Sequence, residues 1–366
     1  MRIGIITPAP PDSLHGNRIT ALRWAMILRR LGNRVSIAQT YDGKPYDLLV
    51  ALHARKSHPA VINFRRQNPE GPVIVALTGT DVYRDIRTSH SARKSLDMAT
   101  RIVVLQPKAT EELRPSWQKK TRVIYQSVRN GQALTGRSGR SAKPRANNTH
   151  TKERSSASFD VSVIGHLRAV KDPFRTAMAA RLLPDSSKVR VLQIGGAMTG
   201  TMAKRAHKEM SINQRYQWLG EQSRSRVRCI LSGSSLCVLS SRMEGGANVL
   251  SEAIAASVPI LASRIDGNIG ILGSDYPGYF DLGDTAQLAR LLSRAETSPR
   301  YLAELKARGK SLARFTDPAR EEQAWSDLIS ELSFQEEPTI ARRVCYSMKQ
   351  RGRKHERPNS QTSSRF

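Results

Sequence analysis

Residues 240–266, SSRMEGGANVLSEAIAASVPILASRID, are the stretch of sequence that decides the fold. The apolar run Leu236–Leu239 before it is typical of a buried strand, and Pro259–Ala262 of a second one. Between them stand a Gly-Gly turn and a helix predicted over about Asn248–Ala256. A strand, a loop, a helix and a further strand in this order predict an α/β fold with a parallel sheet.

The same stretch carries two glutamates, Glu244 at the tip of the loop and Glu252 in the helix. Ionised carboxylates only accept hydrogen bonds, so each can bind the vicinal hydroxyls of a sugar in a bidentate way. The helix N-terminus between them has open backbone N–H groups, which favour an anionic or hydroxyl-rich ligand. Two solvated glutamates on a surface helix are the plainer alternative. The Gly-Gly-Ala-Asn loop and its setting favour a ligand site.

The bulk composition is that of a soluble globular protein. The 366 residues suffice for two domains, and the hydrophobic content is 39%. No apolar run approaches the ~20 residues that span a bilayer. The first ten residues resemble a strand more than a signal peptide. Three cysteines, Cys229, Cys237 and Cys345, show no metal-type spacing and fit a reducing compartment. We therefore expect a cytoplasmic protein without stable membrane association.

The formal charge of +28 raises the possibility of nucleic-acid binding. Two segments of low apolar content, 131–158 and 335–366, together hold +10 of this charge. The rest lies on the part expected to fold, where an anionic substrate or a solvated surface explains it equally well. No zinc-finger, RNP or KH signature accompanies the charge. Specific nucleic-acid binding is therefore kept only as a remote alternative.

Residues 1–128 are predicted to form the first domain. Ile3–Ile6 is a strand, Ile19–Leu31 a helix and Val35–Ala38 the next strand, which gives a βαβ opening and a parallel sheet. A dinucleotide fold would show G-x-G-x-x-G after the first strand, but this loop has only Gly16. An oxidoreductase is therefore a distant alternative.

Polar side chains also follow later strands of this first domain. The carboxyl ends of parallel strands are where open α/β sheets bind ligands. The candidates there are His53, Thr80, Asp81 and Arg84.

The second half of the chain divides at changes of composition. Residues 129–158 are rich in Ser, Arg, Asn and Thr and are predicted to be a linker or insertion. Residues 159–317 read as a second α/β domain, followed by a helix over 318–332. The basic tail 333–366 lacks apolar periodicity and is predicted to be disordered.

The sequence resembles family 4 glycosyltransferases of the GT-B fold over about residues 1–332. IGHLRAVKDP opens the second domain and EGGANVLSEAIAASVPI stands near its end, in the order and spacing of that family. Further segments resemble the selenosugar synthases of selenoneine biosynthesis (SenB-type), namely TPAPPDSLHGNRITALRWA, LLVALHARKS, VALTGTDVYRD, RVIYQS and RMEGGANVLSEA. The resemblance implies two Rossmann-like, doubly wound domains facing a cleft, with the helix 318–332 crossing back onto the first.

The resemblance also implies a reaction and a donor site. A sugar, N-acetylglucosamine in the SenB-type enzymes, would move from UDP to the selenium of anionic selenophosphate. Glu244 would bind sugar hydroxyls and Glu252 the ribose. Arg168 and Lys171 would stabilise the leaving diphosphate. The other donor contacts would come from Gly16, Asn17, Gly246, Ala247 and Asn248.

The acceptor side is implied in the same way. His53 and Asp81 would act near the reacting atoms, and Thr80, Arg84 and His166 would bind the acceptor. Each of the two histidines has an ordinary loop role as its alternative. No D-x-D motif stands at a strand end, so neither a metal ion nor another obligatory cofactor is expected.

Two points stay open at this level. An ordinary family 4 enzyme would use a hydroxyl acceptor on a lipid or polysaccharide instead of selenophosphate. The oligomeric state is not indicated.

One departure from the family stands out: Ser257 replaces the usual glycine after the helix, which suggests a slightly different turn at a cost of ~1 kcal/mol.

Overall fold

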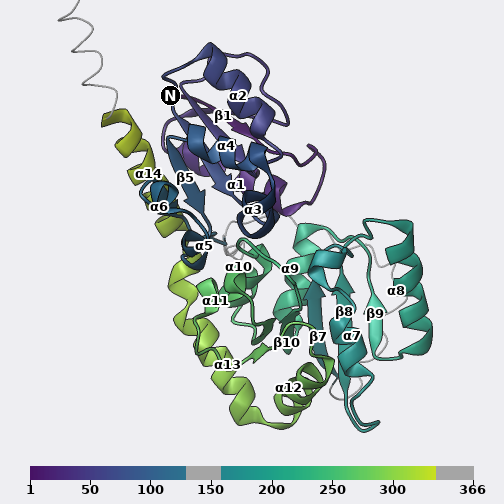
Figure 1. The fold of residues 1–366 in the computed structure, drawn as a ribbon. Helices are drawn as coiled ribbons and strands as arrows, with labels where there is room; N and C mark the ends of the chain where they lie inside the picture. The colour runs from purple at the N-terminus through teal and green to yellow at the C-terminus, as the bar shows by residue number, and fades with distance from the viewer. Residues whose placement is uncertain (129–157, 335–366) are drawn as a thin grey trace, which may run out of the picture. The chain divides into compact units, whose positions relative to one another are not determined.

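The computed structural model describes residues 1–128 and 158–334 of this chain (Figure 1). All but the last residue of the predicted linker, and all but the first two residues of the predicted tail, lie outside these residues. Met1–Glu322 form one unit and Gln323–Phe366 a second. Both sheets lie in the first unit. No helix among the described residues combines the length and apolar character needed to cross a bilayer.

The first sheet has six parallel strands in the order β2-β1-β3-β4-β5-β6. The strand order reverses between β1 and β3, which makes the carboxyl ends of these two strands the switch point where α/β sheets bind ligands. Every residue of β3 and β4 is buried, as expected for central parallel strands built from continuous apolar runs. Its strands are β1 Arg2–Ile6, β2 Arg34–Ala38, β3 Leu48–Leu52, β4 Val73–Leu77, β5 Arg101–Val104 and β6 Thr121–Val123.

The second sheet repeats this design in the order β12-β11-β10-β7-β8-β9, again with parallel pairs only. The order reverses between β7 and β10. Two parallel sheets of six strands with connecting helices confirm the predicted α/β class. The strands are β7 Phe159–Ile164, β8 Val189–Ile194, β9 Tyr216–Trp218, β10 Leu236–Leu239, β11 Ile260–Ser263 and β12 Tyr279–Phe280.

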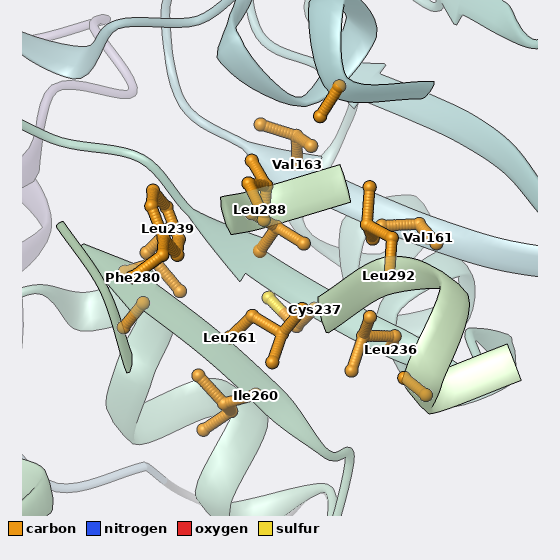
Figure 2. Packing of buried hydrophobic residues seen from close by; sticks show 14 of the residues in the cluster. Val161, Val163, Leu236, Cys237, Leu239, Ile260, Leu261, Phe280, Leu288 and Leu292 are labelled. Carbon is orange, nitrogen blue, oxygen red and sulfur yellow. The ribbon is translucent and has the colours of Figure 1, made fainter. Parts of the chain in front are cut away.

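The hydrophobic core around the second sheet includes β10, the strand that precedes the Glu244 loop. Figure 2 shows side chains of β7, β10 and β11 packed with Leu288 and Leu292 of helix α12. Cys237 of β10 is fully buried here, and burial raises the pKa of its thiol to about 12. It is therefore a small apolar core residue and not a reactive thiol.

The helices join successive parallel strands. In the first half they are α1 Gly16–Arg30, α2 His58–Gln67, π-helix η1 Asp81–Asp85, α3 Ile86–Thr88, α4 His90–Met98, α5 Lys108–Glu111 and α6 Pro115–Gln118. In the second half they are η2 Ala169–Lys171, α7 Arg175–Ala180, α8 Gly200–Ile212, α9 Arg224–Gly233, α10 Asn248–Ala255, α11 Asp266–Leu272, α12 Thr285–Thr297, α13 Pro299–Ser311, η3 Ala313–Thr316 and α14 Pro318–Phe334.

One boundary differs from the predicted one in a way that matters. Helix α1 begins at Gly16 and not at Ile19, because the polar residues before Ile19 form its first turn without breaking the helical backbone. Gly16 and Asn17 therefore lie at a helix N-terminus and not in a loop. Strand β6 ends at Val123, so the segment carrying Gln126 lies beyond it. Gly32 has φ +82° just after α1, so a glycine in the left-handed conformation ends this helix.

The turn after α10 is not the different turn that Ser257 was expected to impose. Ser257 adopts the left-handed conformation itself, with φ +55°. The N–H of Val258 donates to the carbonyl of Ala253 at 3.0 Å and that of Ser257 to Ile254 at 3.0 Å, which is a Schellman cap. Ser257 thus forms the left-handed turn that a glycine would form at this position. Its Cβ makes this backbone conformation less favourable than it would be for glycine.

We expect Ser257→Gly to raise the free energy of unfolding by about 0.5–1 kcal/mol, because glycine adopts this φ without the Cβ penalty. Part of this stabilisation is offset, since glycine also increases the conformational entropy of the unfolded chain. Ser257→Ala is the matched control, since alanine keeps the penalty. Denaturant unfolding of the three proteins checks this. Equal stability of the glycine and alanine variants would contradict a strained left-handed serine.

Candidate functional site

A cavity of about 590 Å³ lies at the carboxyl edges of both sheets, within residues 1–322. The first sheet contributes the loops that follow β1, β3 and β4. The second contributes those after β7, β8 and β10. Both switch points of the strand order therefore open onto one volume, which is where the fold places a ligand.

Most of the residues predicted from the sequence meet at this cavity. They come from segments more than two hundred residues apart, and only the parallel topology of the two sheets brings them together. Those that line it are Gly16, Asn17, His53, Thr80, His166, Arg168, Lys171, Glu244, Gly246, Ala247, Asn248 and Glu252.

Asp81 and Arg84 do not line the cavity, which corrects the direct roles expected for them. Asp81 is fully buried, and its carboxylate accepts from the backbone N–H groups of Ala54 at 3.0 Å and Gly79 at 2.8 Å. It ties together the loops after β3 and β4. Arg84 is exposed and donates to Asp85 at 3.2 Å. Both residues shape the site without reaching a ligand.

Glu244 forms a buried ion pair with Lys171 at the second switch point. Ser240, which follows β10, holds the loop that carries Lys171. Its hydroxyl donates to the carbonyls of Lys171 at 3.2 Å and Asp172 at 2.9 Å. Asp172 takes a left-handed conformation, with φ +43°. The cation and the carboxylate are thus fixed in place before any ligand binds. Arg168 lies in the same loop with its side chain exposed.

The N-terminus of α10 points its backbone at the cavity. Ala247 is its N-cap residue, and within the described structure no side chain caps it. Asn248, the first helical residue, is held by the Arg23 guanidinium at 3.1 Å from its Oδ1. The open N–H groups at such an end favour an anion. The N-terminus of α1, at Gly16 and Asn17, lines the same cavity.

Glu252 lies one turn further along α10 and is largely buried. Burial raises the pKa of its carboxyl, and Arg224, Arg23 and Arg228 act in the opposite direction. A buried carboxylate is costly unless cations or hydroxyl donors compensate it. This part of the cavity is therefore suited to a ligand that donates hydroxyl hydrogen bonds.

Histidines gather on the other side of the cavity. The rings of His15 and His166 meet edge to face, with centroids 5.3 Å apart. Burial lowers the pKa of His15, and the neighbouring His166 and Arg168 lower it further. The neutral imidazole is thereby favoured near neutral pH.

His53 is held in a strained conformation at the end of β3, with φ +74°. Its Nε2 lies 3.4 Å from the Thr80 hydroxyl and 3.7 Å from the Asp85 carboxylate, and its Nδ1 lies 3.9 Å from Asp81. A non-glycine residue at positive φ costs about 1–3 kcal/mol and persists where the surroundings fix it, often at functional sites. Within the described residues, no three His, Cys, Asp or Glu side chains gather closely enough to hold a metal ion.

Sequence reasoning missed several lining residues, which are His15, Arg23, Lys56, Gln126, Glu221, Arg224 and Arg228. Gln126 and Lys56 follow strand ends, so the rule that found His53 could have found them. Arg23, Arg224 and Arg228 lie on helices, where an arginine in so basic a chain carries no signal of its own.

The Gly-Gly turn brings the two halves into backbone contact. A Cβ on Gly245 would lie 2.6 Å from the backbone nitrogen of Gly79, and one on Gly246 would lie 2.5 Å from the Cβ of Leu105. Real Cβ atoms do not approach so closely. These glycines are therefore required for close approach, and neither has a positive φ that would demand glycine.

Known proteins resemble this chain in sequence and in fold. The family model for "Glycosyl transferases group 1" matches residues 147–312. These residues resemble the group 1 glycosyltransferases. A search of curated proteins finds no significant match.

Solved structures with the same GT-B fold span nearly the whole chain. HepE of Anabaena, crystallised with UDP-glucose, has a TM-score of 0.67 at 15% identity, over 90% of this chain and 100% of its own. Sucrose-phosphate synthase of Thermosynechococcus elongatus has a TM-score of 0.70 at 16% identity, over 91% and 99%. The predicted GT-B architecture is confirmed.

The residues that match the family model line only part of the cavity. Arg168, Lys171, Glu244 and the α10 residues fall within the matched range, whereas the loops after β1, β3 and β4 lie outside it. The family match therefore bears on the loops of the second half and not on those of the first.

We expect Gly245→Ala to lower the free energy of unfolding by about 1–3 kcal/mol, because the new methyl group overlaps the backbone at Thr78 and Gly79. Gly309→Ala in α13 is the control, since nothing lies near its Cβ position and alanine favours the helix by up to ~1 kcal/mol. Denaturant unfolding checks both. A Gly245 variant as stable as wild type would mean that the halves do not touch at this turn.

Proposed function

We propose that this glycosyltransferase moves N-acetylglucosamine from its UDP conjugate to the selenium of selenophosphate, giving a selenium-linked sugar. The coarse part of this proposal rests on the GT-B fold, the group 1 match and the neighbour HepE, which was crystallised with UDP-glucose. The selenium part rests on the segments that resemble selenosugar synthases. The observation that carries the proposal is the carboxylate pair Glu244 and Glu252 flanking the N-terminus of α10 in one cavity.

The donor would lie along α10. Glu252 would accept hydrogen bonds from the ribose hydroxyls, which offset the cost of its burial. The N–H groups at Gly246, Ala247 and Asn248 would meet the diphosphate or the sugar. Glu244 would accept from sugar hydroxyls, and Gly16 and Asn17 would approach the diphosphate from the N-terminus of α1.

In the transfer, the bond between the sugar C1 and the diphosphate oxygen breaks and a bond between C1 and selenium forms. The electron pair of the broken bond leaves with UDP. Lys171 and Arg168 would stabilise this growing negative charge, and Lys171 is already fixed by Glu244. No metal ion is needed for this step when fixed cations supply the charge.

The acceptor would lie on the histidine side. Lys56 and Arg168 supply positive charge near His15 and His166, against one acidic neighbour, Glu221. An anionic acceptor requires such charge once it loses water. Thr80 and His53 would complete it. Asp81 and Arg84 would act only by positioning, because neither reaches the cavity.

UDP release from UDP-N-acetylglucosamine, measured with and without selenophosphate, tests the function. We expect release that depends on selenophosphate, together with a selenium-bearing sugar detected by mass spectrometry. Binding of the UDP-sugar without selenium-dependent turnover would keep the glycosyltransferase and replace the acceptor with a hydroxyl group. Failure to bind any UDP-sugar, with salt-dependent retention of DNA, would point to nucleic-acid binding instead.

Two variants separate the proposed donor roles. Glu252→Ala removes a charged, bidentate acceptor and should weaken UDP binding by about 10–100-fold. Arg168→Ala should lower kcat by about 100-fold or more and change UDP affinity less, because its charge interaction grows in the transition state.

Arg226→Ala is the matched control for both, since Arg226 is exposed on α9 and does not line the cavity. Isothermal titration with UDP and steady-state kinetics supply the readouts. If Glu252→Ala and Arg168→Ala both behaved as this control does, the site would be misassigned.

A further inference from the structure

Glu321, in the first turn of α14, places a carboxylate in the interior of the first unit, residues 1–322. Its side chain is 1% exposed. It accepts from Trp24 Nε1 at 2.8 Å, from Arg23 Nε at 3.1 Å, and from both the backbone N–H, at 2.9 Å, and the hydroxyl of Ser127. It thereby joins α1 to the segment that follows β6.

Burying a carboxylate costs several kcal/mol unless its lone pairs are filled. A carboxylate has about four acceptor positions, and four donors occupy them here. The arrangement is therefore complete, and stability alone could explain it. The other contacts of the Arg23 guanidinium indicate a further role for Glu321.

Arg23 extends from Glu321 to the loop that begins α10. Its Nη1 donates to Asn248 Oδ1 at 3.1 Å. Its Nη2 donates at 3.1 Å to the amide oxygen of Gln126, when that amide is oriented to satisfy its neighbours. The Gln126 nitrogen then donates to Asn248 Oδ1 and to the Gly246 carbonyl, both at 3.0 Å. Two side chains of the first half thus hold the loop that carries the proposed donor contacts.

We propose that Glu321 is a positioning residue that sets the Gly246–Asn248 loop against the first half of the chain, acting through Arg23 and Gln126. A guanidinium has the fixed fork needed to bind a carboxylate and an amide at once. Glu321 fixes the direction of that fork. The effect on turnover rests on the proposed function; the effect on the order of the loop does not.

The chain supplies its own control one residue away. Glu322 also pairs with α1, through Arg30, but both side chains are 33% exposed. Exposed pairs of this kind contribute little. Glu322→Gln therefore removes the same charge from the same turn of α14 without touching the network.

Arg23→Lys is the sharpest test, because lysine keeps the charge beside Glu321 but cannot reach Asn248 and Gln126 at the same time. We expect faster amide hydrogen exchange over residues 245–250, by about tenfold, with the melting temperature close to that of wild type. Glu321→Gln should act in the same direction, since its amide group cannot accept from all four donors. Glu322→Gln should exchange as wild type does.

The second readout is kinetic. In Arg23→Lys, we expect kcat to fall by about tenfold while UDP binding in the absence of acceptor changes by less than about threefold, because the loop is misplaced but its groups remain. Exchange and kcat equal to those of Glu322→Gln would overturn the proposal and leave Glu321 a purely structural residue. A wild type that binds no UDP would refute the proposed function, and the exchange measurement would still decide the role of Glu321.

Discussion

The backbone contact between the Gly245–Gly246 turn and the loop at Thr78–Gly79 is the constraint on which the site depends. A Cβ on Gly245 would overlap the backbone of Thr78 and Gly79 at this point. Because the loops meet there, the carboxyl edges of the two sheets face one volume instead of two. Residues that the sequence separates by more than two hundred positions can then act on one ligand. The same contact brings Asn248 within reach of Arg23 and Gln126.

Charge is arranged before a ligand arrives. Lys171 is held by Glu244, and the loop that carries it is held by Ser240. A cation fixed in this way loses little conformational freedom when a diphosphate binds or leaves, so more of its interaction is available to the reaction. Glu252 presents the opposite case, because burial raises the pKa of its carboxyl and a hydroxyl-rich ligand relieves that cost. The donor side is thus prepared by one satisfied pair and one group that a ligand completes.

The sequence predicted the parts of this site that follow local rules. Apolar runs predicted the strands, and the strand-end rule placed His53 and Thr80 correctly at the cavity. It placed Asp81 wrongly, because a carboxylate after a strand can as easily accept from its own loops as from a ligand. Ser257 was misjudged since a side chain's preference against positive φ is weaker than the packing that closes α10. Arg23 and Glu321 lie in helices at opposite ends of the chain, and no local pattern indicates that they meet.

The balance of charge in the cavity bears on the choice of acceptor. Six Lys or Arg residues and three glutamates line it. Arg23, Arg224 and Arg228 lie near Glu252, and Lys171 is paired with Glu244. Lys56 and Arg168 lie near His15, and so does the third glutamate, Glu221, which offsets one of the two charges. A hydroxyl acceptor would leave these two cations without a ligand charge to meet apart from the diphosphate. An anionic acceptor meets them directly, and its loss of water is offset in the same step. The net positive charge of this cluster is therefore an argument for the proposed anionic acceptor and against a neutral one.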